Sequence, residues 1–547
     1  MTNRSSPFKN GGERFFPPKK ENKIPMTRPK HYLPAICLVC CCATATLTSC
    51  SSDDPKQDYN PLIDDPKEET PVKPDEPTTQ AGYDEQYRPQ IHFTPAKNWM
   101  NDPNGMVYAD GVYHLFYQYN PQGNDWGNMS WGHATSTDLM HWTEQPVALT
   151  RDALGDIFSG SAVIDKDNTA GFGANAMVAL YTSAGSDGKQ QQSMAYSTDG
   201  GNNFTRYTAN PVIKNDDDTL RDPKVFWHEA SKHLIMALAK GWKMGVEFYA
   251  STDLKSWQHQ STFFVPLAGR PSLQWECPDL IQMGNKWVLL VSVNPGGPIL
   301  GSGMMYFVGQ FDGKEFKADI TPEVGGTVEP QWLDYGMDNY AGVTWSNTGD
   351  RRIMIGWMNN WTYAGAVPCS PWRSAMTLPR ELKLTVVDGK SLLCAPVVSE
   401  IDKIAGTWST SHSVPQNGET LDVNDAYQLR LTLSLDKNTT VTIGNDRDEY
   451  FSFDVNAEAR TLTVHRTSAT GKTFGTFSIP SIQAPLNTTG NTVTIDLFVD
   501  QSSVELITAG GTMSMTNLVF PQSIYNRVNV SGAACEAQYR SLSSIWK

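Results

Sequence analysis

The sequence contains few cysteines outside its N-terminal region, and the part expected to fold has no strongly basic stretch. Five of the nine cysteines lie between Cys37 and Cys50, and the other four are scattered without the spacing of metal ligands. We therefore expect buried thiols rather than a disulfide framework, no metal site and no required cofactor. The formal net charge of −14 disfavours attraction to nucleic acid or to anionic lipid. These absences leave an uncharged polymer as a more natural substrate.

The apolar stretch from Leu33 to Leu47 is too short to span a bilayer as a permanent helix. It follows a basic segment, and it therefore has the features of a signal-peptide core. The stretch ends in the sequence LTSC, which resembles the bacterial lipobox. That resemblance implies that Cys50 is lipidated and becomes the first residue of the mature protein. We interpret residues 1–50 as a leader and lipoprotein signal peptide.

Residues 51–90 are rich in Pro, Asp, Glu, Lys and Thr and contain few apolar residues. Such a composition cannot bury enough surface to fold, so this segment is predicted to be a flexible acidic tether. Its first residues, SSDD, resemble the surface-export signal of some diderm bacteria. We therefore expect an exported lipoprotein of the outer membrane, attached through its lipid only. The cell surface is the favoured location, and a periplasm-facing position is the alternative.

Three short acidic motifs each lead into an apolar, strand-like run: WMNDPNG around Asp102, RDP around Asp222 and ECP around Glu276. The intervals between them are close to two units and one unit of a repeat of about 60 residues. Retaining glycoside hydrolysis needs two carboxyl groups about 5 Å apart, and a third carboxyl group can hold the sugar. An isolated Asp-Pro or Asn-Gly pair usually marks a turn. Three carboxylates in register on a repeat favour a functional site instead.

A second motif recurs on a similar period and consists of an aspartate followed four or five residues later by an aromatic residue. Three of the four copies begin with Ser-Thr-Asp. Because Asp and Ser readily cap turns, we interpret these motifs as structural surface turns, with the aromatic residue packed between repeats. The four pairs are Asp138/Trp142, Asp199/Phe204, Asp253/Trp257 and Asp312/Phe316.

Extending the acidic series along the chain gives five starts, each followed by short strand patterns with hairpin signals such as Asp110-Gly111. Five units of about four strands predict a five-bladed β-propeller over residues 91–395. The innermost strands of such a fold converge on one axial pocket. Asp338 lies in register on the fifth unit and could either contact substrate or cap a strand. The five starts are Asp102, Phe158, Asp222, Glu276 and Asp338.

Residues 401–547 carry alternating patterns such as YQLRLTLSL and TVTIDLFVD, without a further carboxylate motif in register. Alternation interrupted by polar turns predicts a two-sheet β-sandwich. The fold class is therefore all-β, a propeller followed by a sandwich. The expected role of the sandwich is to brace the propeller, and carbohydrate binding is the lesser alternative.

The motifs WMNDPNG, FSGS, RDP, ECP and TLPREL, in this order, resemble those of glycoside hydrolase family 32, which contains invertases, inulinases and levanases. The resemblance covers residues 92–382, and SSVELI followed by LVFP resembles the C-terminal sandwich of that family. It implies that Asp102 is the nucleophile, Glu276 the acid/base and Asp222 the stabiliser of the transition state. The substrate-binding positions that it implies are Asn101, Gln118, Trp126, Phe158, Ser159, Arg221 and Trp361.

A nucleophile must stay ionised, so hydrogen-bond donors such as the Asn101 side chain are expected around Asp102. Cys277, next to Glu276, is interpreted as a buried thiol because no Cys–His arrangement is suggested. For Trp126 and Trp361, the alternative to stacking on sugar is a place in the core or between blades.

The resemblance implies a β-fructofuranosidase that hydrolyses fructan polysaccharide or fructo-oligosaccharide of the levan or inulin type, exo-acting, with some activity on sucrose. Endo cleavage and fructosyl transfer on the same scaffold remain alternatives. An inverting five-bladed arabinanase or xylosidase would need carboxyl groups about 6.5 to 9.5 Å apart, and its motifs fit less well. A fructan-binding surface protein without catalysis is the alternative from another class.

Overall fold

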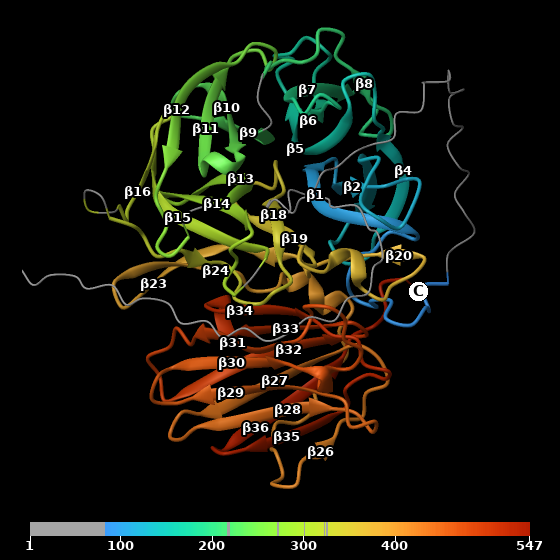
Figure 1. The fold of residues 1–547 in the computed structure, drawn as a ribbon, viewed down its shortest axis with the longest axis vertical. Helices are drawn as coiled ribbons and strands as arrows, with labels where there is room; N and C mark the ends of the chain where they lie inside the picture. Colours follow the sequence, from blue (N-terminus) through green and yellow to red (C-terminus); the bar gives the residue numbers. More distant parts are fainter. Residues whose placement is uncertain are drawn as a thin grey trace, which may run out of the picture. The chain divides into compact units, whose positions relative to one another are not determined.

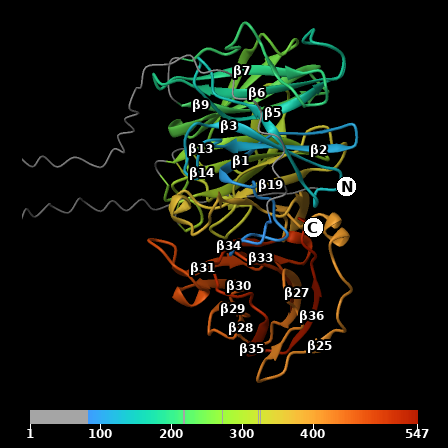
Figure 2. The ribbon, with the colours of Figure 1, turned by 90° about the vertical axis from the view of Figure 1, so that its right-hand side faces the viewer.

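The computed structural model describes residues 82–546 except 216–218, 271–272, 300, 322 and 324–325. The predicted signal peptide with Cys50, and residues 51–81 of the predicted tether, lie outside the described residues. The prediction was wrong for the end of the tether: Arg88 is fully buried, and the Gln90 amide donates to Asp500 Oδ1 at 2.8 Å, so this part packs against the sandwich. The described residues form strands joined by turns and a few short 3-10 helices, in an all-β propeller and sandwich as expected (Figures 1 and 2). Among these residues, no helix has the length and apolar character needed to cross a membrane.

The first three blades are four-stranded antiparallel meanders. A short strand from later in the chain, β20, joins the edge of the first blade. Blade 1 contains β1 (Asn98–Ala109), β2 (Val112–Tyr119), β3 (Ser130–Ser136), β4 (Thr143–Leu149) and β20 (Trp372–Arg373). Blade 2 contains β5 (Asp156–Asp165), β6 (Ala176–Ala184), β7 (Gln190–Ser197) and β8 (Thr205–Arg206). Blade 3 contains β9 (Leu220–His228), β10 (His233–Lys240), the 3-10 helix η1 (Gly241–Lys243), β11 (Gly245–Ser251) and β12 (Gln258–Phe264).

The last two blades are less regular at their outer edges. Blade 4 contains β13 (Gln274–Met283), β14 (Lys286–Asn294), β15 (Gly303–Phe311), β16 (Phe316–Ala318) and β17 (Gln331–Trp332). Blade 5 contains β18 (Tyr340–Thr344), β19 (Ile353–Met358), η2 (Ala364–Ala366), β21 (Ala375–Met376) and β22 (Arg380–Glu381). The hairpin of β23 (Lys383–Val387) and β24 (Lys390–Cys394), followed by η3 (Ser399–Lys403), leads to the sandwich.

The first strands of the five blades form a closed ring. Neighbouring first strands contact one another in the order β1, β5, β9, β13 and β18, and β18 contacts β1 again. Closure is reinforced by β20, which pairs in parallel with β1 through Asn98 to Trp372 and Trp99 to Arg373. Because the fifth blade and β20 pack against the first blade, residues far apart in sequence meet around one axis.

Each first strand carries a β-bulge at a corresponding place, where two of its residues lie opposite one residue of the second strand. A bulge twists the strand and redirects its side chains, and it accepts a proline that a regular central strand would exclude. Asp222, Cys277 and Ala341 have φ angles of 62°, 46° and 53° within their bulges. The bulged pairs are Asn101/Asp102 in β1, Phe158/Ser159 in β5, Asp222/Pro223 in β9, Cys277/Pro278 in β13 and Ala341/Gly342 in β18.

The repeated Ser-Thr-Asp motifs form turns at the outer ends of the blades. Asp138 Oδ1 accepts hydrogen bonds from Ser136 Oγ at 3.1 Å and from the His141 amide at 2.9 Å. Asp253 Oδ1 accepts the equivalent hydrogen bonds from Ser251 Oγ at 3.1 Å and from the Ser256 amide at 2.7 Å. These aspartates are structural, as the repeat predicted.

The sandwich contains two six-stranded sheets whose inner faces share one apolar core. One sheet contains β25 (His412–Ser413), β36 (Cys535–Ser541), β27 (Tyr427–Ser434), β32 (Thr492–Asp500), β33 (Ser503–Thr508) and β34 (Ser514–Leu518). The other contains β26 (Glu419–Thr420), β35 (Arg527–Ser531), β28 (Thr439–Gly444), β29 (Tyr450–Asn456), β30 (Thr461–Arg466) and β31 (Ile479–Pro485). Two short 3-10 helices, η4 (Ser468–Thr470) and η5 (Ala509–Gly511), lie in its loops. Alternate leucines of β27 are fully buried, and each contributes about 1.5 to 3 kcal/mol of hydrophobic free energy.

A buried ion pair joins the fifth blade to the sandwich. Asp338, just before β18, accepts hydrogen bonds from Arg466 Nη1 at 2.7 Å and from the Leu518 amide at 2.8 Å. The Tyr363 hydroxyl also donates to this carboxylate, and both charged side chains are completely buried. Of the two roles that the sequence left open, substrate contact is disfavoured, because the Asp338 side chain has no exposed surface. Its contacts instead anchor the propeller to the sandwich.

A second buried network crosses the same interface. His92 lies between the carboxylates of Asp500 and Glu505, with Nδ1–Oδ2 and Nε2–Oε1 distances of 2.7 and 2.8 Å. Arg380 also forms an ion pair with Glu505. The propeller and sandwich are thus held together by desolvated charges as well as by apolar packing.

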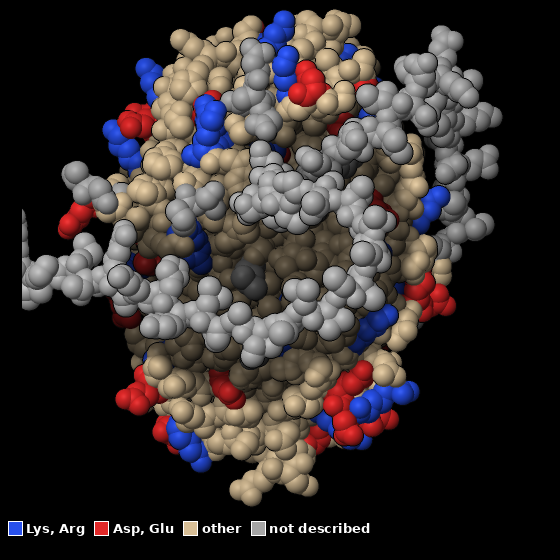
Figure 3. All heavy atoms as spheres, in the orientation of Figure 1, with Lys and Arg blue, Asp and Glu red and all other residues tan. Residues whose placement is uncertain are grey.

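On the face drawn in Figure 3, charged side chains lie mostly around the edge, and the hollowed middle is formed mainly by other residues.

Candidate active site

The bulges of β1, β9 and β13 bring the three motif carboxylates to one place, around Cys277. The Cys277 amide donates a hydrogen bond of 2.9 Å to Asp222 Oδ2. Its thiol sulfur lies 3.5 Å from Asp102 Oδ2 and 3.7 Å from Asp222 Oδ2. Cys277 directly follows Glu276, so side chains from blades 1, 3 and 4 meet within hydrogen-bond reach of one residue.

The carboxylate of Asp102 is held by donors from two neighbouring bulges. Asn101 Nδ2 donates to Oδ1 at 3.0 Å, which is the contact expected from the sequence, and Ser159 Oγ donates to Oδ2 at 2.7 Å. Burial and the nearby charge of Glu276 raise the pKa of Asp102, and the donors Asn101, Ser159 and Cys277 oppose this rise. The donors therefore fix the side chain in position and offset part of the rise in its pKa.

The carboxylate of Asp222 is deeply buried, with 6% of its side chain exposed. Its backbone amide donates to Thr182 Oγ1 at 2.9 Å, which fixes the bulge against blade 2. Burial raises the pKa of Asp222 to about 7, Arg221 opposes the rise, and the charges of Glu276 and Asp102 add to it. Buried carboxylates this close together do not all ionise readily, so the cluster tends to retain a proton near neutral pH.

Both oxygens of the Glu276 carboxylate accept hydrogen bonds. Arg221 Nε and Nη2 donate to Oε1 at 3.3 and 3.0 Å, and the Tyr340 hydroxyl donates to Oε2. Arg221 Nη1 also donates to Gln190 Oε1 at 3.2 Å, and its Nε lies 3.8 Å from Asp222 Oδ2. In this structure Arg221, which the sequence placed among the sugar-binding residues, serves as the cation between two carboxylates.

Gln118 and Phe158 line the bulge of the second blade. The Gln118 amide donates to the Ile157 carbonyl at 3.0 Å, and Gln118 itself is buried, so it supports the strand that presents Ser159. The ring of Trp126 meets that of Phe158 edge-on, with ring centres 6.1 Å apart. Trp126 remains 38% exposed, which leaves part of its ring open to a ligand.

Trp361 belongs to the nucleophile side of the site. Its ring stacks on that of Trp99 with centres 5.9 Å apart, and Trp99 Nε1 donates to Asn101 Oδ1 at 2.8 Å. A chain of contacts therefore runs from Trp361 through Trp99 and Asn101 to the carboxylate of Asp102. The half-buried Trp361 also contacts Trp357, with ring centres 4.9 Å apart, so its packing role is shown and stacking on sugar stays a prediction.

Sequence reasoning missed three residues of the site: Tyr340, Thr182 and Gln190. It also assigned no contact to Cys277, although a buried thiol was expected and is found. Burial, together with the neighbouring carboxylates, raises the pKa of this thiol well above its usual range, so it is a weak hydrogen-bond donor rather than a nucleophile. The available signal was proline: Pro223 and Pro278 interrupt central strands, and that placement indicates bulges.

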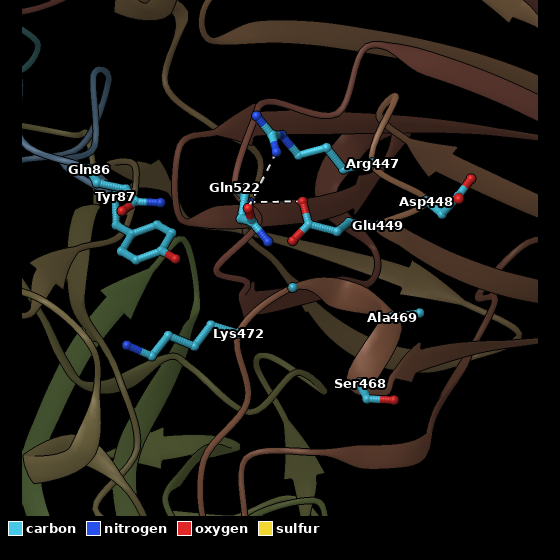
Figure 4. A pocket seen from close by; sticks show the side chains of 10 residues that line it. Gln86, Tyr87, Arg447, Asp448, Glu449, Ser468, Ala469, Lys472 and Gln522 are labelled. Atoms are coloured by element: carbon cyan, nitrogen blue, oxygen red, sulfur yellow. Dashed lines mark hydrogen bonds between the residues drawn. The ribbon is translucent and has the colours of Figure 1, made fainter.

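A hollow of about 670 Å³ lies elsewhere, between residues 86–87 and the sandwich (Figure 4). Some of its polar groups contact one another: the Gln522 amide donates to Glu449 Oε2 at 2.8 Å, and Arg447 donates to Gln522 Oε1 at 3.5 Å. None of the three motif carboxylates lines it. In the part of the chain that the structure describes, no group of three or more His, Cys, Asp or Glu side chains could hold a metal ion.

Taken together, the site offers a fixed carboxylate, a second carboxyl group held by an arginine and a tyrosine, and a third, deeply buried one. Such a set can attack a sugar carbon, exchange a proton with a leaving oxygen and stabilise positive charge on the ring.

Comparison with known proteins agrees with this arrangement. Residues 92–396 match the glycosyl hydrolases family 32 N-terminal domain, and residues 400–545 match the family 32 C-terminal domain. The levanase of Bacillus subtilis is 42% identical over 489 residues, covering 84% of this chain and 70% of that protein. The extracellular exo-inulinase inuE of Aspergillus niger is 37% identical over 517 residues, covering 85% and 96%. The crystal structure of exo-inulinase from Aspergillus awamori superposes with a TM-score of 0.79 at 34% identity, covering 85% of this chain and 100% of that chain. The chain belongs to glycoside hydrolase family 32.

Proposed function

We propose that this protein is a retaining β-fructofuranosidase that hydrolyses fructans of the levan or inulin type. The observation that carries the proposal is the meeting of Asp102, Asp222 and Glu276, at or beside the bulges of blades 1, 3 and 4, linked by Cys277 and Arg221. Relatives named levanase and exo-inulinase, similar over most of this chain, support the choice of substrate.

In the proposed reaction, Asp102 attacks the anomeric carbon of a terminal β-fructofuranosyl unit while the glycosidic carbon–oxygen bond breaks. Glu276 gives its proton to the leaving oxygen, which leaves a fructosyl ester on Asp102. Water then gives a proton to Glu276 as its oxygen bonds to the anomeric carbon, and fructose leaves as the ester bond breaks. Asp222 stabilises the positive charge of both transition states and holds the sugar hydroxyls.

Exo action with release of fructose is the favoured mode, and some sucrose cleavage is expected because sucrose carries the same fructosyl unit. Endo cleavage or fructosyl transfer would use the same ester intermediate. A binding protein without catalysis is disfavoured, since all three carboxylates are present and mutually positioned.

The deciding experiment incubates the purified protein separately with inulin, levan and sucrose and resolves the products over time by chromatography. Fructose alone from the outset supports exo action, whereas a ladder of oligosaccharides supports endo cleavage. New fructosylated acceptors at high sucrose indicate transfer. Asp102→Asn should abolish product release while retaining polymer binding, and Asp319→Asn on the exposed surface is the matched control. Wild-type protein that binds polymer without releasing sugar would refute the enzymatic proposal.

We further propose that the protein is exported and attached to the outer membrane through a lipid on Cys50, with the catalytic domain at the cell surface. The support is the LTSC sequence after a short apolar core, followed by an acidic tether. Cys50→Ser should release the protein from the membrane fraction of its host. Protease applied to intact cells should degrade a surface-exposed enzyme and spare one that faces the periplasm.

A further inference from the structure

The connection between the second and third strands of blade 3 presents an exposed tryptophan beside the catalytic carboxylates. This connection is η1, and its central residue, Trp242, has 51% of its surface exposed. Lys240, which ends β10, pairs with Leu220 at the start of β9, directly before Arg221. The connection therefore lies at the same end of the blade as Arg221 and Asp222.

The backbone of η1 packs directly on Arg221. A Cβ atom on Gly241 would lie 3.1 Å from Arg221 Nη1 and 3.1 Å from the Thr219 carbonyl oxygen, so glycine permits this close approach. The helix also contacts β13, the strand that carries Glu276. A chain of neighbours therefore runs from Trp242 through the adjacent Gly241 and through Arg221 to the carboxylate of Glu276.

The position of Trp242 indicates which part of the substrate it would meet. The fructosyl unit that is attacked lies on Asp102, and the oxygen that Glu276 protonates joins it to the next sugar unit. Groups on the Glu276 side therefore meet the leaving part of the substrate. Trp126 and Trp361 lie instead on the Asp102 side, through Phe158 and Trp99.

Building on the proposed function, we infer that Trp242 is a platform for the leaving chain of a fructan, contacting the second sugar unit beyond the cleaved bond. Furanose rings present apolar C–H faces, and the broad ring of tryptophan buries such faces while keeping little conformational freedom. Because Arg221 and Gly241 stand between Trp242 and Glu276, the platform lies beyond the first leaving unit. Sucrose has no second unit there and does not reach it.

A second exposed aromatic residue continues the track away from the axis. Phe264 ends β12, the outer strand of blade 3, and it pairs with Gly245, which begins β11 just after η1. Its exposed fraction is 53%, which is large for phenylalanine. Trp242 and Phe264 therefore occupy the same end of one blade, in the order in which a departing polymer chain would meet them.

Trp227 offers a matched control for Trp242. It lies in the same blade with an exposed fraction of 50%, but it pairs with Leu234 near the turn between β9 and β10, at the opposite end from the carboxylates. A general effect of losing a surface tryptophan should appear equally in both variants, whereas a subsite effect should appear only at Trp242.

The test measures kcat and KM of Trp242→Ala, Trp242→Phe and Trp227→Ala on sucrose and on short inulin-type and levan-type oligosaccharides. We expect Trp242→Ala to raise KM for the oligosaccharides by about tenfold and to leave sucrose kinetics within about twofold. Trp242→Phe should recover most of the loss, and Trp227→Ala should match wild type on all substrates.

Equal KM changes on sucrose and oligosaccharides would overturn the inference, and so would unchanged oligosaccharide kinetics in Trp242→Ala. Failure of wild-type protein to cleave any fructosyl substrate would instead refute the proposed function. The two failures are distinguished within the same set of assays.

Discussion

Replacing Arg466 by methionine would leave the carboxylate of Asp338 buried without its charged partner. Both side chains are 0% exposed, and the pair is 2.7 Å apart. Removing one member of a buried ion pair costs about 3 to 5 kcal/mol, because the remaining charge stays desolvated. Asp338 keeps the donors Tyr363 and Leu518, so we expect a loss near the lower end, about 3 kcal/mol of unfolding free energy.

The assay is urea unfolding followed by tryptophan fluorescence, with activity measured on the folded variant at low temperature. The double variant Asp338→Asn with Arg466→Met should recover part of the loss, because the buried charge is then absent. Lys286→Met is the control: its pair with Asp319 is 29% and 36% exposed, and its loss should cost less than about 1 kcal/mol. A midpoint for Arg466→Met equal to that of the control would refute this account. A raised KM in folded Asp338→Asn would indicate that Asp338 contributes to substrate binding.

Three further predictions concern titration and positioning. Burial lowers the pKa of His92, but hydrogen bonds and charge from its two carboxylate partners prevail and raise it to about 9. Protonated His92 therefore contributes its full share of the unfolding free energy below pH 6.5, and this share is lost as pH rises through 9. His92→Gln should flatten this decline, measured as urea midpoints across that pH range. Tyr340→Phe removes the hydroxyl that positions Glu276, and kcat should fall at least about tenfold with little change in KM or circular dichroism. Ser159→Ala removes a donor that opposes the raised pKa of Asp102, so the acidic limb of the kcat/KM profile should move to higher pH.

The sequence was sufficient to predict the fold class and the three carboxylates, because both depend on features repeated along the chain. Five copies of a strand pattern define the blades, and Asp102, Asp222 and Glu276 occur near the start of three of these copies. The donor Asn101 was also predictable, since it adjoins the carboxylate that it contacts.

The remaining contacts depend on geometry that no local pattern encodes. Tyr340 reaches Glu276 across 64 positions of sequence, and Ser159 reaches Asp102 across 57. Asp338 shows the converse: its place in the repeat suggested a link with the pocket, yet its carboxylate is buried against Arg466. The sequence repeat predicts in which blade, and near which end of a strand, a residue lies. The direction of its side chain depends on how the blades close into a ring.

The sandwich is coupled to the catalytic centre through the segment that precedes β18. Gly336 lies against the sandwich so closely that a Cβ atom there would be 2.2 Å from the Thr516 carbonyl oxygen, and Asp338 is fixed two residues later. Two residues after Asp338, Tyr340 begins β18 and donates to Glu276. Because the chain between these points is short, docking of the sandwich restrains the strand that positions the acid/base carboxylate. The bracing role of the sandwich stays a prediction, and this chain of contacts from the sandwich to Glu276 supports it.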